Sequence, residues 1–118
     1  MIYNMQEAKR LALAEYPQFA ETLIPAVDNG WMFVPASAGH DFMKGFRLWP
    51  DYWADAVVIR SETEVHGHRI DPAGMRVWSR DGSLVEVMCG LLDLPAPGQP
   101  NSPRLAIGHA PRLWRREL

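Results

Sequence analysis

The sequence predicts an α+β fold, with an N-terminal helix packed on a mainly antiparallel sheet of about five to six strands. The chain opens on an amphipathic segment, short apolar runs follow it, and Asn-Gly and Asp-Gly pairs typical of hairpin turns separate some of these runs. With 118 residues, 47% of them hydrophobic and 22% charged, the chain has the size and composition of one globular domain spanning residues 1–118.

The opening helix is expected to begin at Asn4, because Glu7 stands three residues later as in a capping box. Apolar side chains then recur at helical spacing as far as Tyr16, and Pro17 keeps Tyr16 out of the α region. This pattern predicts a three-turn helix whose single apolar stripe packs on the sheet.

A first hairpin is predicted at Asn29-Gly30, between strands at 23–27 and 31–34, because this pair suits a type I′ turn. Residues 37–53 are rich in aromatic side chains but interrupted by Gly and Pro. We expect them to form a loop with a short helix, which folds onto the sheet or onto a partner.

The second half of the chain reads as a meander. Its strands are expected at 56–59, 64–70, 75–79, 84–88 and 105–107, with turns at 71–74 and 81–82 and an extended crossing over 91–103. A two-residue loop at Asp81-Gly82 would place Trp78 opposite Val85 and leave apolar side chains on both faces. The face that holds Trp78 then needs a cover: the aromatic segment, a second copy of the chain, or another protein.

Charge and cysteine content narrow the functional classes. A net charge of -2 and a pI near 6.0 argue against binding to nucleic acid. The lone Cys89 lies in an apolar run, so we expect it to pack as a small hydrophobe in a reducing compartment. With no secretory signal and no membrane-spanning apolar run, the sequence predicts a cytoplasmic protein without membrane contact.

Signatures of catalysis and of cofactor binding are weak. His66 and His68 stand at i and i+2, on one side of a predicted strand, but no third ligand follows at a metal-binding spacing. The paired carboxylates at 51 and 55 and at 62 and 64 are interpreted as a solvated acidic face. Nucleophile elbows and phosphate-binding glycine loops are absent from the sequence. We therefore predict no catalytic residue, no metal and no cofactor.

The unusual feature of the composition is its tryptophan content, with five Trp residues in the chain. Trp and Tyr dominate protein interfaces, and nearby carboxylates would steer a basic partner toward them. The predicted partner-binding residues are Trp49, Asp51, Tyr52, Trp53, Asp55, Glu62, Glu64 and Trp78.

Three segments, in this order, resemble a family of small bacterial immunity proteins. They are the helix QEAKRLALA (6–14), the strand GWMF (30–33) with Ser37 after it, and the turn and strand IDPAGMRV (70–77). Members of that family have one helix against an antiparallel sheet and are encoded beside polymorphic toxins, which they neutralise by binding. The resemblance implies a cognate toxin as partner and implies no catalytic residue.

Two alternatives remain open. One is a small α+β enzyme or ligand-binding domain, with His66 or His68 in a pocket lined by Trp31, Phe46, Trp49 and Trp53. The other is a homodimer that buries the Trp78 face for stability.

Overall fold

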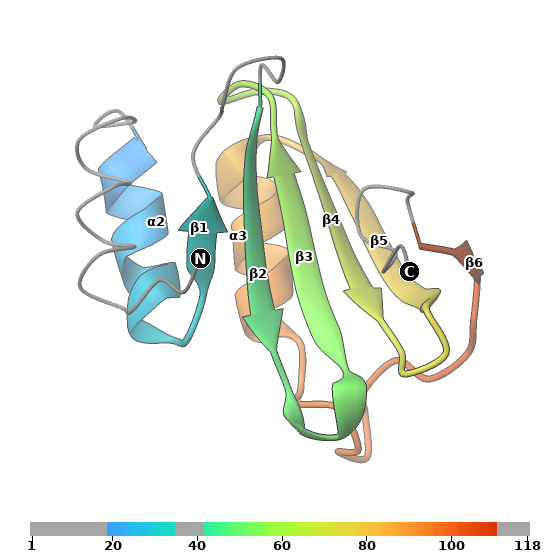
Figure 1. Cartoon of the computed structure of the whole chain (residues 1–118). Helices are drawn as coiled ribbons and strands as arrows, with labels where there is room; N and C mark the ends of the chain where they lie inside the picture. Colours follow the sequence, from blue (N-terminus) through green and yellow to red (C-terminus); the bar gives the residue numbers. More distant parts are fainter. Residues whose placement is uncertain (1–18, 35–41, 111–118) are drawn as a thin grey trace.

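The computed structural model describes residues 19–34 and 42–110. Its elements are α2 (Ala20–Asp28), β1 (Met32–Val34), β2 (Met43–Leu48), the 3-10 helix η2 (Pro50–Tyr52), β3 (Ala54–Ile59), β4 (Val65–Ile70), β5 (Met75–Gly82), α3 (Leu84–Asp93) and β6 (Gly108–His109). The six strands form one antiparallel sheet in the order β1-β2-β3-β4-β5-β6 (Figure 1). The predicted α+β class is confirmed, and α2 precedes the sheet. The helix predicted from Asn4 to Tyr16 lies outside the described residues.

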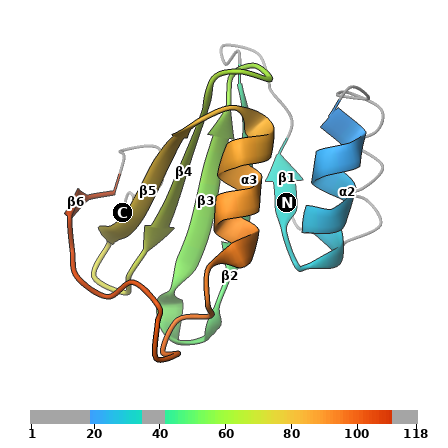
Figure 2. The ribbon, with the colours of Figure 1, turned by 180° about the vertical axis from the view of Figure 1, so that it is seen from behind.

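Both described helices lie toward the same side of the sheet. Figure 2 shows α3 across one face, with α2 beside it at the β1 end. Apolar side chains of both helices and of four strands form the main core between these layers; its largest fully buried members include Trp31, Phe33, Leu23, Met43, Ile59, Leu84, Met88 and Leu91. No helix among the described residues covers the other side of the sheet, which we call the open face.

The segment 84–88 is helical, so the strand predicted there is wrong. Ser83 caps α3, because its Oγ accepts the backbone N–H of Glu86 at 3.2 Å. Leu84, Val87, Met88 and Leu91 share one buried side of the helix. A helix cannot supply a strand partner, so the predicted register between β5 and 84–88 fails with it.

The segment 23–27 is also helical rather than extended. Leu23, Ala26 and Val27 have the i, i+3, i+4 spacing of a helix face and are fully buried, whereas Pro25 lies on the exposed side. The predicted hairpin at Asn29-Gly30 is a helix end, where Gly30 has a φ of +94° and its N–H donates to the Val27 carbonyl at 3.0 Å.

The aromatic segment is more regular than the predicted loop, because β2 runs through it and pairs with both β1 and β3. Gly45 is required within β2, since a Cβ there would lie 2.5 Å from Cε1 of Phe33. The short helix expected in this segment is η2, between β2 and β3.

The expected strands at 56–59, 64–70 and 75–79 correspond to β3, β4 and β5. At the turn between β4 and β5, the Asp71 carboxylate accepts the N–H groups of Ala73 and Met75, each at 2.9 Å. A β-bulge at Arg69/Ile70 shifts the pairing of these two strands by one residue. The last strand lies at Gly108–His109 rather than at 105–107, and the expected crossing begins only after α3 ends at Asp93.

Candidate functional site

The eight predicted partner-binding residues do not form one patch. Half of them, at positions 49, 51, 52 and 53, lie in the connection between β2 and β3. Glu62 and Glu64 are exposed in the turn between β3 and β4, at the opposite end of the sheet (Figure 1). Asp55 and Trp78 lie within strands and face the helices, as described below.

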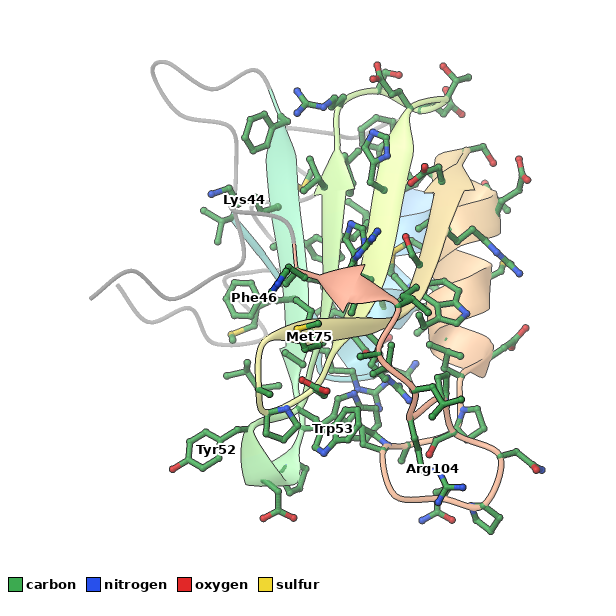
Figure 3. All side chains as sticks on the ribbon, turned by 90° about the vertical axis from the view of Figure 1, so that its right-hand side faces the viewer. Lys44, Phe46, Tyr52, Trp53, Met75 and Arg104 are labelled. Atoms are coloured by element: carbon green, nitrogen blue, oxygen red, sulfur yellow. The ribbon has the colours of Figure 1, made fainter. Side chains whose placement is uncertain are left out.

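The last residue of β2 together with the connection to β3, residues 48–53, is called the β2–β3 tip here. It is closed by the Trp49 N–H, which donates to the Trp53 carbonyl at 2.9 Å. Asp51 and Tyr52 have φ values of +62° and +69°, a left-handed conformation that costs an L-residue about 1–2 kcal/mol. Tyr52 is 83% exposed and projects away from the sheet in Figure 3. The tip therefore holds a large side chain in solvent on a strained backbone, a combination that occurs at functional loops.

Beneath the tip, Asp55 is completely buried, so its predicted place on a solvated acidic face is wrong. The β3–β4 register sets it opposite Arg69, which is also fully buried. Its carboxylate accepts from Arg69 Nε at 2.6 Å, from Arg69 Nη2 at 3.0 Å and from Trp49 Nε1 at 2.9 Å. Three donors and an opposite charge compensate the desolvation of this carboxylate.

The same network extends to neighbouring segments. Arg69 Nη1 donates to the Pro95 carbonyl and so ties the chain after α3 to the sheet. The Arg47 guanidinium lies 4.0 Å from the centre of the Trp49 ring, a cation–π contact. Burial lowers the pKa of Arg47, the Asp55 charge opposes this effect, and the Arg69 charge adds to it. The base of the tip is thus fixed by buried charged contacts.

Trp78 lies on the face that α3 covers, so the cover expected for it is supplied by the chain itself. Its ring is partly buried against the core, and a Cβ added at Gly90 of α3 would lie 3.1 Å from it. The bulge at Arg69/Ile70 sets this orientation, because an unshifted register would pair Trp78 with His68 on the open face.

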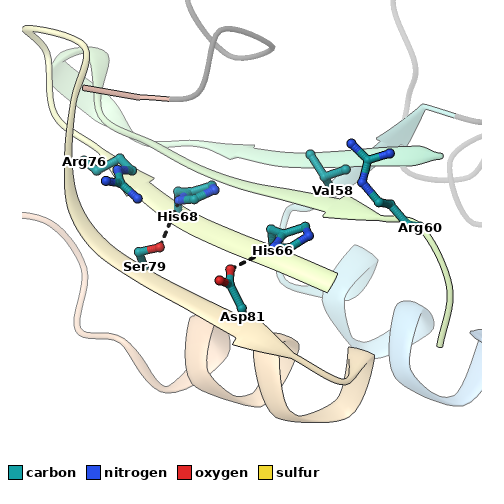
Figure 4. A pocket seen from close by; sticks show the side chains of 7 residues that line it. All are labelled: Val58, Arg60, His66, His68, Arg76, Ser79 and Asp81. Atoms are coloured by element: carbon teal, nitrogen blue, oxygen red, sulfur yellow. Dashed lines mark hydrogen bonds and ion pairs between the residues drawn. The ribbon is translucent and has the colours of Figure 1, made fainter. Parts of the chain in front are cut away.

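The open face carries a shallow pocket of about 300 Å³, close to the lower limit for small-molecule sites. Its walls come from the C-terminal end of β3 and the residue after it, from β4 and from β5 (Figure 4). The lining residues are Val58, Arg60, His66, His68, Arg76, Ser79 and Asp81. None of the rings proposed for an aromatic-lined pocket takes part, and Trp31 is instead fully buried in the core.

Two hydrogen-bonded pairs organise this pocket. His66 Nδ1 lies 2.8 Å from Asp81 Oδ1, and because a carboxylate only accepts, Nδ1 carries the proton. His68 Nδ1 lies 3.3 Å from the Ser79 hydroxyl. Burial, reinforced by the Arg76 charge, lowers the pKa of His68 to about 4, although Asp81 acts in the opposite direction. His68 is therefore neutral at pH 7.

The predicted i, i+2 arrangement of His66 and His68 on one side of a strand is present, because both residues line this pocket. Each imidazole is engaged by a different residue of β5, and residues 19–34 and 42–110 contain no group of three His, Cys, Asp or Glu that could hold a metal.

Cys89, expected to be buried, is exposed on the outer side of α3.

Neither described helix is long and apolar enough to cross a membrane. No family model, curated protein or solved structure matches this chain.

Sequence reasoning missed the contributions of Arg76, Ser79 and Asp81 to the pocket. The turn at 71–74 was predicted. If the β4–β5 pairing is extended from that turn without a bulge, His66 pairs with Arg80, whereas in the structure it pairs with Asp81. Only the bulge brings the Asp81 and Ser79 side chains to the histidines, and no turn residue or periodicity indicated it.

Proposed function

We propose that the protein is a protein-binding module that presents the β2–β3 tip to a partner. The observation that carries this proposal is Tyr52, which is 83% exposed on a backbone in the left-handed region. Tyr residues contribute disproportionately to binding free energy at protein interfaces. Asp51 beside it is exposed and supplies a negative charge, which suits a basic partner surface.

Rigidity of the tip supports the same role. Binding is weakened when loops and side chains must be ordered at the interface, so a tip that is already fixed loses less conformational entropy. The contacts of Asp55 with Trp49 and Arg69 provide that fixation from below. Leu48 at the edge of the tip is 67% exposed and adds apolar contact area.

We further propose that the partner is a bacterial toxin, which the protein neutralises by occluding its active site in the cytoplasm of the producing cell. The resemblance of segments 6–14, 30–33 and 70–77 to small immunity proteins supports this choice of partner. Such a role requires no cofactor and no catalytic residue in this chain.

Co-expression with the product of the adjacent gene tests the proposal. We expect the two proteins to co-purify and expect the toxin-producing cells to grow only when this chain is present. Failure to co-purify, together with no rescue of growth, would contradict the proposed function.

Variants of the complex locate the interface. Tyr52→Ala keeps a Cβ on the same backbone and should weaken binding by about thirtyfold, as expected for an interface hot spot. Glu62→Ala lies in the turn between β3 and β4, which is at the opposite end of the sheet from the tip, and should leave affinity unchanged. If Glu62→Ala weakens binding and Tyr52→Ala does not, the interface lies at the β3–β4 turn instead.

A further inference from the structure

Arg76 lines the open-face pocket with a guanidinium that has no hydrogen-bond or ion-pair partner among the described residues. In particular, its side-chain Nε is buried and has no partner within the described part of the chain. A buried donor left unsatisfied costs about 1–3 kcal/mol, so a site that retains one is incomplete without a ligand or water.

The position of Arg76 is set by the last strand. Gly108 of β6 pairs with Arg76, and the Ile107 N–H donates to the Arg76 carbonyl at 2.8 Å. A Cβ at Gly108 would lie 2.8 Å from Arg76 Nη2. The guanidinium therefore occupies space that only a glycine leaves open, and it points toward His68 in Figure 4.

The other polar groups of the pocket complement an anion. Arg60 contributes a second guanidinium to the lining, whereas the single carboxylate, Asp81, is already hydrogen-bonded to His66. Asp81 therefore does not neutralise the Arg76 guanidinium. When the Ser79 hydroxyl donates to His68 Nδ1, the neutral imidazole carries its proton on Nε2 and can donate it to a ligand.

We propose that the open-face pocket binds the oxyanion of a small ligand, a phosphate monoester or a carboxylate. The Arg76 guanidinium is its main contact, the Nε2–H of His68 is a further donor, and the Ser79 hydroxyl orients His68 through Nδ1. A guanidinium matches the geometry of both oxyanions with two parallel hydrogen bonds, and a volume of about 300 Å³ admits a small molecule rather than a macromolecular chain. None of the tip residues lines the pocket, so this site is independent of the proposed partner interface.

The test follows the imidazole NMR signals of His66 and His68 in the full-length protein during titration with inorganic phosphate or, separately, acetate. Sodium chloride holds the ionic strength constant, so that simple screening does not change along the titration. We expect saturable shifts of the His68 signals, and the anion with the smaller dissociation constant identifies the ligand class. The absence of saturable shifts with both anions would overturn the proposal.

Two charge-matched variants distinguish binding at this site from attraction of the anion to the overall charge of the protein. Arg76→Gln should weaken binding of the preferred anion about tenfold or more, because it removes the main contact. Arg80→Gln removes the same charge from the opposite face, where Arg80 lies over Trp78, and should change the dissociation constant less than twofold. Equal losses in both variants would overturn the proposal, because they would show attraction to net charge alone.

Ser79→Ala gives an additional check that does not depend on folding of the Arg76 variant. The removed hydroxyl holds His68 in the tautomer that donates from Nε2, so binding should weaken severalfold while the circular dichroism spectrum stays unchanged. Unchanged affinity in Ser79→Ala would contradict the assigned geometry.

Discussion

Replacing Asp55 with Asn should remove a large part of the stability of this fold. The substitution keeps the shape of the side chain but removes the charge that faces the fully buried Arg69 guanidinium. It also turns one acceptor into an NH₂ group that would oppose the N–H donors of Arg69 or Trp49. Breaking a buried ion pair by removing one partner costs about 3–5 kcal/mol. A domain of ordinary stability has about 5–15 kcal/mol in total.

Urea unfolding at pH 7, followed by tryptophan fluorescence and circular dichroism, measures this loss. Asp51→Asn is the matched control, because Asp51 is exposed and Asn tolerates its positive φ; its unfolding free energy should change by less than about 0.5 kcal/mol. The double variant Asp55→Leu with Arg69→Met should be clearly more stable than Asp55→Asn, because it leaves no buried charge unpaired. A loss below about 1 kcal/mol in Asp55→Asn would refute the reasoning that this pair anchors the tip.

Two further predictions concern packing and pH. Gly45→Ala should lower the free energy of unfolding by about 1–3 kcal/mol in the same urea assay, because its Cβ would lie 2.5 Å from Phe33 and 2.9 Å from Val57; unchanged stability would contradict this close packing. Stability should fall as the pH drops from about 6.5 toward 4, because the pKa of His68 is lowered to about 4 in the folded protein and the unfolded chain therefore takes up the proton first. His68→Gln should reduce this pH dependence, and an equally steep dependence in that variant would assign the effect to other groups.

Sequence reasoning succeeded where short-range chemistry decides the structure. The β-branched run in β3 and the turn 71–74, with Pro at its second position, depend on residues a few positions apart. It failed at α3, where Asp81-Gly82 before an apolar run was interpreted as a hairpin. Ser83 and Glu86 have the spacing of a capping box at that point, and this signal would have identified the helix.

The candidate site also has parts that local sequence predicts and parts that depend on strand register. Asp51 and Tyr52 could be found from their residue types and their place between two predicted strands. The burial of Asp55 could not, because it depends on the register that brings Arg69 opposite to it. The pocket depends on one bulge, and a shift of one residue exchanges the faces to which Trp78 and Ser79 point.

The strand order has a consequence for how the chain folds. All five pairings in the described sheet join strands that follow one another along the sequence, and β2 to β5 are linked by short turns. Loops of this length lose little entropy on closure, and a fold rich in such local pairings is expected to form quickly. We expect the hairpins within 43–82 to form first, so that the tip and most of the pocket are assembled before residues 94–110 pack against them.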